Sequence, residues 1–277
     1  MGPAFKAAIC QLGTNKTFLD ETGAFGHTNA AEFVDRFKFS AIKSPDRFLE
    51  DPRMKEYREV GKYCIAKVLM NLENLDNLFP AGNAGWYETL FERLDIESGR
   101  YDKNQLAVIT YNYDRSLECA LWKMIEAQNL GDNARIKELW DRRPIIVHVH
   151  GALDLFDPGQ RGHRSYEQTV DPEKVSTAAS QIQIIYEADP TTPAFEHARE
   201  LIQSAERVIF LGFGFNRENV ERLQVFNEPT QREKIEGTTF RMGDRDRAYV
   251  FNEVFGPGLN PRQLVGQRID NYIYEKL

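Results

Sequence analysis

Short β-rich runs alternate with helical segments in the second half of this 277-residue chain, and each run ends in polar or glycine residues. The runs cover residues 105–111 (QLAVITY), 144–149 (PIIVHV) and 207–211 (RVIFL), with residues 238–240 as a further candidate. Strands that are joined through helices form parallel sheets whose two faces are covered by those helices. The pattern therefore predicts an α/β fold with a Rossmann-like parallel sheet and helices on both faces.

Helices are predicted between and after these strands from the spacing of the apolar residues. They cover residues 115–129, 133–140, 195–204, 216–224 and 244–255, with one or two more inside a long stretch of loops over 151–192. The tail from Gly256 contains Pro257, Pro261 and Gly266, so we expect it to be a loop.

The first hundred residues predict helices and no strand. Apolar positions at helical spacing indicate helices over residues 3–12, around Phe33 to Phe37, over 52–72 and over 86–94, and Ser44-Pro45 marks a further helix start. Gly61 lies on the apolar stripe of the longest helix, which indicates close packing against a neighbour. We expect residues 1–100 to form a helical lid or interface within the same domain as a Rossmann-like core over 101–277.

Composition narrows the class of protein. The formal net charge is −7, so the chain lacks the bulk positive charge of a nucleic-acid-binding or membrane-surface protein. No apolar run approaches the roughly 18–20 residues that span a bilayer, and no secretion signal opens the chain. Three widely spaced cysteines, Cys10, Cys64 and Cys119, form neither a zinc ribbon nor a disulfide framework. These features predict a cytoplasmic protein without a bound metal.

Residue types suited to a nucleotide site follow the three main strands, in segments 111–114, 150–151 and 212–216. Ligands of open parallel sheets bind at the carboxyl ends of the strands, where these segments would meet. Asn112 offers a donor and an acceptor, and His150 titrates near neutral pH and can accept a proton. Glycines let the backbone approach a phosphate or ribose, and the helix that starts near Asn216 would point amide donors toward it.

Each of these residues also has a structural interpretation. Asn112 is a candidate cap for the following helix, Asp114 a candidate first-turn carboxylate, and His150 a candidate buried imidazole. His148 alternates with His150 along its strand and is interpreted as structural. The Gly-Phe-Gly run lacks the third glycine of a dinucleotide fingerprint, because position 217 is arginine.

The order of these segments resembles one family. Residues 109–118 (ITYNYDRSLE), 148–153 (HVHGAL) and 209–223 (IFLGFGFNRENVERL) resemble the SIR2 (sirtuin-like) superfamily, in particular the SIR2-like domains of bacterial defence NADases. The resemblance extends from about Gln105 to Leu223, less than half of the chain. It implies a Rossmann-like domain that takes NAD as its substrate.

The resemblance also implies roles for individual residues. Asn112 would orient the nicotinamide ribose and a water molecule, His150 would be the catalytic base, and Asp114 would lie near the nicotinamide amide. Further residues implied to contact the dinucleotide are Tyr113, Gly151, Gly212, Phe213, Gly214 and Asn216.

Two departures from the family pattern refine the expectation. Sirtuin deacylases carry a four-cysteine zinc module after the His-Gly strand, whereas no cysteine follows Cys119 here, so hydrolysis of NAD is favoured over deacylation. The family also opens with a strand and a glycine-rich phosphate loop, whereas this chain opens with MGPAFKAAICQLG. We expect that Met1 lies inside a longer parent sequence; the alternative is a genuine loss of the loop.

The sequence therefore predicts an NAD⁺ glycohydrolase that releases nicotinamide and ADP-ribose, with a role in anti-phage defence. NAD is its expected partner, together with a homo-oligomer or sensor partner. The alternatives are a non-catalytic module that senses NAD or ADP-ribose, an NAD-dependent protein deacylase or ADP-ribosyltransferase, and an interaction scaffold with an inactive site.

Overall fold

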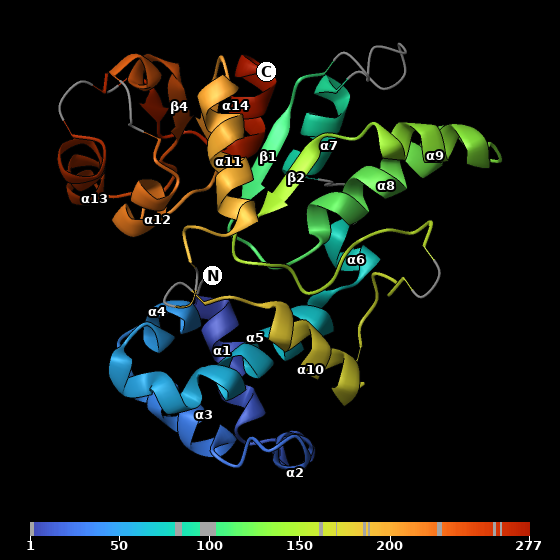
Figure 1. The fold of residues 1–277 in the computed structure, drawn as a ribbon, viewed down its shortest axis with the longest axis vertical. Helices are drawn as coiled ribbons and strands as arrows, with labels where there is room; N and C mark the ends of the chain where they lie inside the picture. Colours follow the sequence, from blue (N-terminus) through green and yellow to red (C-terminus); the bar gives the residue numbers. More distant parts are fainter. Residues whose placement is uncertain are drawn as a thin grey trace. The chain divides into compact units, whose positions relative to one another are not determined.

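The structure is a computed structural model. It describes residues 3–80, 85–94, 104–160, 163–169, 171–184, 187, 189–225, 229–256, 259–260 and 262–277. The chain forms two compact units (Figure 1), and each is described by itself. Unit 1 comprises residues 1–83, 111–123 and 150–188, and unit 2 comprises residues 84–110, 124–149 and 189–277.

Unit 1 is helical in its described residues. Its elements are α1 (Pro3–Leu12), α2 (Lys16–Ala24), α3 (Ala30–Phe39), α4 (Pro45–Leu49), the 3₁₀ segment η1 (Pro52–Tyr57), α5 (Arg58–Leu72), α6 (Leu75–Leu78), the first half of α8 (Ser116–Gln128) and α10 (Pro172–Gln181). α1 has the bounds that the apolar spacing predicts, and Ser44 caps α4 in front of Pro45 as expected. The helix predicted over 52–72 is divided into η1 and α5.

The core of unit 1 surrounds α5, against which α1, α3, α4 and α10 pack. Four aromatic rings from three elements form one cluster beside it: Phe33, Phe37, Phe48 and Tyr57. A Cβ on Gly61 would lie 2.5 Å from Leu49 Cδ1, which confirms that this glycine permits close packing with α4. Burial of these side chains supplies the main stabilisation of the unit.

Unit 2 holds all the described strands. Its elements are α7 (Gly85–Arg93), β1 (Ala107–Thr110), the second half of α8, α9 (Asn133–Asp141), β2 (Ile145–His148), α11 (Pro193–Ser204), β3 (Val208–Phe210), α12 (Arg217–Arg222), the 3₁₀ segment η3 (Pro229–Lys234), β4 (Ile235–Thr238), α13 (Asp244–Tyr249), the π-helical segment η4 (Val250–Val254), β5 (Leu264–Val265) and α14 (Ile269–Lys276).

The strands are parallel, as the alternation of strands and helices predicts. β1 pairs with β2, and β3, β4 and β5 form a three-stranded sheet in that order, so the hydrogen bonds of the described strands define two small sheets. The α/β class with a helical N-terminal region is confirmed. β4 begins three residues before the predicted run at 238–240, because Ile235, Gly237 and Thr238 are the buried residues that pair with β3 and β5.

The prediction of a loop for the whole C-terminal tail is wrong. β5 adds to the edge of β4, and α14 packs against α7 within unit 2. α14 is held by the buried Tyr272 and Ile273, and the Tyr272 hydroxyl donates a 2.7 Å hydrogen bond to Glu236. Tertiary burial of two side chains thus outweighs the helix-breaking residues that precede them. No described helix combines the length and the apolar character that crossing a bilayer would require.

Candidate functional site

The ends of β1 and β2 bring the first two predicted segments together. Thr110 is in register with His148, and the Val149 amide donates a 3.1 Å hydrogen bond to the Thr110 carbonyl. The segments that follow therefore leave the same edge of the β1–β2 sheet. Directly beyond this edge, the rings of Tyr111 and His150 meet edge to face with their centroids 4.9 Å apart.

The residues after β2 are fixed to the end of α10. His150 is buried, and its carbonyl accepts a 2.9 Å hydrogen bond from the Gln183 amide. Gly151 has a φ of +79°, and a Cβ there would lie only 2.0 Å from the carbonyl oxygen of Gln181. Gly151 is thus required by the left-handed backbone and by the close approach of another main chain.

The residues after β1 differ in their exposure to solvent. Tyr113 is buried, and its hydroxyl donates to Asp46 Oδ1 at 2.5 Å. Burial raises the pKa of Tyr113 well above its ordinary value, so the phenol stays protonated as a donor. Asn112 is exposed between Tyr111 and Tyr113. The structure therefore gives Tyr113 an anchoring contact in the core of unit 1 and leaves Asn112 at the surface of the turn.

Asp114 makes a hydrogen bond at the start of α8, the structural interpretation that the sequence offered for this carboxylate. Its Oδ1 accepts a 3.2 Å hydrogen bond from the Ser116 amide, at the start of α8. An acceptor at this position satisfies a helix amide that has no partner within the helix. The contact fixes the carboxylate of the Asn-x-Asp segment relative to α8.

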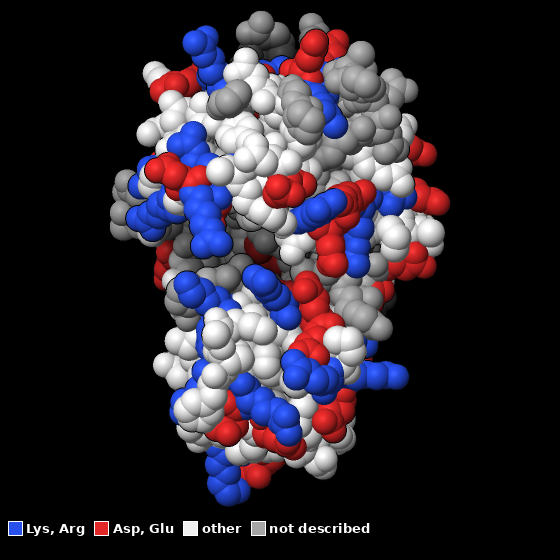
Figure 2. All heavy atoms as spheres, turned by 90° about the vertical axis from the view of Figure 1, so that its left-hand side faces the viewer, with Lys and Arg blue, Asp and Glu red and all other residues white. Residues whose placement is uncertain are grey.

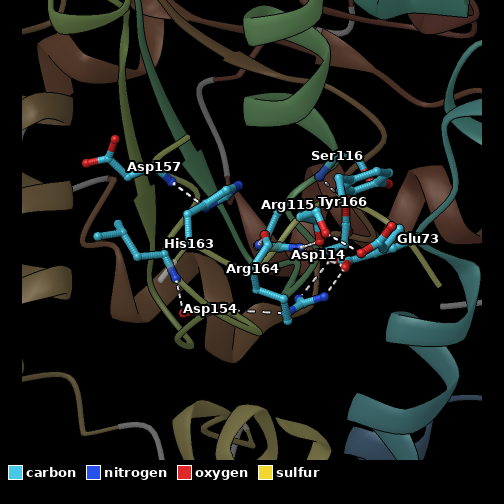
Figure 3. A network of polar contacts seen from close by, with 12 residues as sticks. Glu73, Asp114, Arg115, Ser116, Asp154, Asp157, His163, Arg164 and Tyr166 are labelled. Atoms are coloured by element: carbon cyan, nitrogen blue, oxygen red, sulfur yellow. Dashed lines mark hydrogen bonds and ion pairs between the residues drawn. The ribbon is translucent and has the colours of Figure 1, made fainter. Parts of the chain in front are cut away.

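A buried ion-pair network is centred on Arg115, the residue that follows Asp114 (Figure 3). The Arg115 side chain donates from Nε and Nη2 to the two oxygens of Glu73, at 2.9 and 2.8 Å. Arg115 also donates to the carbonyls of Arg164 and Ser165 at 2.9 and 3.1 Å, and Arg164 makes two further hydrogen bonds to Glu73. Sequence reasoning missed this network, because no local pattern pairs Glu73 with an arginine 42 residues later.

The glycine segment after β3 forms a turn of its own within unit 2. Gly212 has a φ of +60°, its amide donates a 3.1 Å hydrogen bond to Thr238 Oγ1, and a Cβ there would lie 2.9 Å from Ile269 Cδ1. A Cβ on Gly214, in contrast, would meet no heavy atom of the described residues within 4 Å. Gly212 is therefore needed for the turn itself, whereas Gly214 leaves open space at the surface.

The remaining residues of this turn are engaged in packing and capping. The rings of Phe210, Phe213, Phe215 and Phe255 contact one another with centroid separations of 5.2–5.9 Å. Asn216 Oδ1 accepts from the amides of Glu218 and Asn219 at 2.9 and 3.3 Å, and so caps the six-residue α12. Two first-turn amides that the sequence assigned to a ligand are thus paired with Asn216.

The predicted site residues therefore form two groups. Segments 111–114 and 150–151 lie together in unit 1, and segment 212–216 forms its own turn in unit 2. Across the described residues, no three or more His, Cys, Asp or Glu side chains are arranged to bind a metal ion. Cys10, Cys64 and Cys119 are free thiols.

Comparison with known proteins gives a family match for the segment that contains β1, β2 and β3. Neither a comparison with curated proteins nor one with solved structures gives a match. A family model described as "SIR2-like domain" matches residues 106–231, which include β1, β2, β3 and all three predicted site segments. Domains of this family use NAD, so the match supports an NAD-related function in general. Residues 106–231 of this chain thus form a SIR2-like domain.

Proposed function

We propose that this protein hydrolyses NAD⁺ to nicotinamide and ADP-ribose. The observation that carries the proposal is the placement of Asn112 and His150 at one edge of the β1–β2 sheet. Tyr111, which precedes Asn112, contacts the His150 ring with a centroid separation of 4.9 Å. An amide that can orient a ribose or water and an imidazole that can accept a proton are what this hydrolysis requires.

The reaction needs one bond to break and one to form. The glycosidic bond between the ribose and the cationic nicotinamide ring breaks, and its electron pair leaves with neutral nicotinamide. A water oxygen then bonds to the same ribose carbon, and its proton passes to His150. In this proposal Asn112 orients the ribose hydroxyl or the water, and no metal takes part in the step.

Further residues of the three segments are assigned supporting roles in this proposal. Tyr113 holds one segment through Asp46, and the Gln183 amide holds the other through the His150 carbonyl. Gly151 permits the close approach of the Gln181 carbonyl. The open space beside Gly214 is suited to close approach of a ribose or phosphate to the main chain. We assign Asp114 to the nicotinamide amide, and Gly212, Phe213 and Asn216 to support of the glycine turn.

We further propose that the enzyme acts in the cytoplasm in defence against phage, as part of a homo-oligomer or with a sensor partner. Depletion of NAD would stop phage production together with host metabolism. The proposal rests on the resemblance of segments 109–118, 148–153 and 209–223 to defence NADases. Its test is phage plating on cells that carry the wild-type gene or the His150→Gln variant.

The central experiment measures nicotinamide release from NAD by the purified protein. We expect Asn112→Ala and His150→Gln each to slow release by roughly 10²–10⁴-fold, the usual contribution of acid–base and positioning groups. Matched controls are Asn77→Ala and His197→Ala, exposed residues on α6 and α11. Far-UV circular dichroism and thermal melting establish that each variant is folded.

Two outcomes would contradict the proposal. Wild-type rates in both Asn112→Ala and His150→Gln would remove these residues from the mechanism. Calorimetric binding of NAD by the wild-type protein without any nicotinamide release would replace hydrolysis by the sensor function.

A further inference from the structure

A hollow away from the strand-end segments lies within unit 1. It has a volume of about 460 Å³ and lies between the start of α6 (residues 74–76), the first half of α8, and residues 156, 158, 163 and 165–168. The segments with Asn112 and His150 do not contribute to its lining. Its volume is in the range of natural small-molecule sites, which are about 300–1,000 Å³.

The lining changes in character from the floor to the mouth. Cys119 and Phe156 are buried at the floor, and half-buried rings of Trp122, His163 and Tyr166 form the walls. The exposed residues at the mouth include Asp76, Glu167 and Gln168, and Lys123 also lines the hollow. Flat apolar walls with polar groups of both kinds at the rim favour a planar ligand that carries donors and acceptors.

The wall formed by residues 163–168 is held in place by the ion-pair network (Figure 3). Arg115 donates to the carbonyls of Arg164 and Ser165, and the Tyr166 hydroxyl lies 3.0 Å from Ser116 Oγ. The Arg115 guanidinium also lies 5.6 and 5.9 Å from the ring centres of Phe156 and Tyr166. These contacts fix the aromatic rings before a ligand arrives, which reduces the entropy lost on binding.

His163 supplies a defined donor. Its Nδ1 accepts a 3.3 Å hydrogen bond from the Asp157 amide, and its ring meets Phe156 edge to face at 5.0 Å. Burial, assisted by the nearby Arg115, lowers the pKa of His163, so the ring is neutral at physiological pH. A neutral imidazole whose Nδ1 accepts carries its proton on Nε2, which can donate to a ligand acceptor.

We propose that this hollow is a binding site for a planar, uncharged heteroaromatic molecule between a nucleobase and a nucleoside in size. The rings of Trp122 and Tyr166 would flank the ligand, and His163 would donate to a ring nitrogen or carbonyl. The mouth carries two carboxylates, Asp76 and Glu167, and one ammonium, Lys123, so it disfavours an anionic ligand. The proposal is independent of NAD hydrolysis at the strand-end site.

The test is calorimetric titration of the full chain with adenine and with adenosine, alongside cyclohexanol and choline as non-planar and cationic probes. We expect binding of adenine or adenosine and none of the two other probes. Trp122→Ala should weaken binding by about tenfold or more, the usual loss when a stacking aromatic ring is removed from a base. The matched control is Trp86→Ala on α7, which should bind as the wild type does.

Two further variants separate a lost site from a lost fold. His163→Phe keeps a ring beside Phe156 but removes the donor, and should weaken binding about fivefold. Gln168→Trp places a large group at the exposed mouth and should block entry while leaving the melting temperature unchanged. Asn112→Ala should bind adenine and adenosine as the wild type does, because it belongs to the strand-end site.

The proposal is overturned by any of three results. Neither adenine nor adenosine binds the wild-type chain; binding persists unchanged in Trp122→Ala, His163→Phe and Gln168→Trp; or Asn112→Ala loses binding while those three variants retain it. The last result would assign the ligand to the strand-end site and would leave the test of NAD hydrolysis unaffected.

Discussion

Arg115 and Glu73 form a doubly hydrogen-bonded ion pair whose side chains are 0% and 2% exposed. Arg115 directly follows Asp114, and Glu73 is the C-cap residue that follows α5. The pair therefore joins the start of α8 to the central helix of unit 1. Arg164 adds a second guanidinium to the same carboxylate, so that residues 164 and 165 are held by the pair as well.

Removing the charge of Glu73 from this ion pair should destabilise the fold. Glu73→Gln leaves the buried Arg115 guanidinium without a counter-charge and leaves Arg164 with Asp154 at 3.8 Å as its acidic partner. We expect the free energy of unfolding to fall by about 3–5 kcal/mol. Urea denaturation followed by circular dichroism measures the loss. Arg53→Met, which removes an exposed ion pair with Asp51, is the control and should leave the denaturation midpoint nearly unchanged. Equal midpoints for both variants would show that the buried network contributes little.

The two glycines of the site segments should respond differently to alanine. Gly151→Ala meets both the positive φ and the Gln181 carbonyl, so we expect a loss of at least about 2 kcal/mol in unfolding free energy. Gly214→Ala faces open space and should change stability by no more than about 0.5 kcal/mol. If the main chain at Gly214 approaches the dinucleotide, this variant should raise the KM for NAD. A thermally stable Gly151→Ala protein would contradict the close contact.

Asp46 should make stability depend on pH. Burial raises the pKa of its carboxyl above the ordinary value of 3.8, against the opposing effect of the Tyr113 hydroxyl. An acid whose pKa rises on folding stabilises the fold fully below its unfolded pKa, and this contribution is lost as the pH rises through the folded pKa. Asp46→Asn removes the buried charge, so its melting temperature should exceed that of the wild type increasingly from pH 4 to pH 8. A constant difference across this range would contradict the prediction.

His163 should titrate below the ordinary histidine value. Burial is the main cause of its lowered pKa, and Arg115 and Arg164 act in the same direction, whereas Asp154 and Asp157 oppose them. Stability from the neutral ring is fully present above pH 6.5 and is lost as the pH falls through the folded pKa. Two-dimensional NMR of the imidazole resonances measures this value, to be compared with the ordinary histidine value of 6.5. An unshifted or raised pKa for His163 would contradict the structure around it.

Local sequence patterns were sufficient to predict most of the helices and strands. Apolar spacing predicts α1 with its observed bounds, and Ser44 with Pro45 predicts the start of α4, because capping depends only on neighbouring residues. The runs at 105–111 and 144–149 predict β1 and β2 to within about two residues, since β-branched residues suit a half-buried strand. α2 was missed, although Asn15 caps it through the Phe18 amide.

Features that depend on contacts between distant residues could not be predicted from local sequence patterns. α14 forms because Tyr272 and Ile273 are buried within unit 2, which overrides the prolines and glycines before it. The pairing of Arg115 with Glu73, and the hollow that Cys119 lines together with Phe156 and His163, join segments far apart in the chain. In the site, order along the sequence was enough to bring Asn112 and His150 to one sheet edge, but not to show that Gly151 and Gly212 serve their own turns.

The parallel pairing of β1 with β2 has a consequence for how the protein assembles. The two strands are separated in the chain by α8 and α9, so their ladder forms only after a long crossover has closed. Helices such as α1 and α5 need only contacts between near neighbours and can nucleate much faster. We therefore expect newly synthesised chains to acquire helical content early. The β1–β2 pairing, on which the proposed NAD hydrolysis depends, should form in a later, slower kinetic phase.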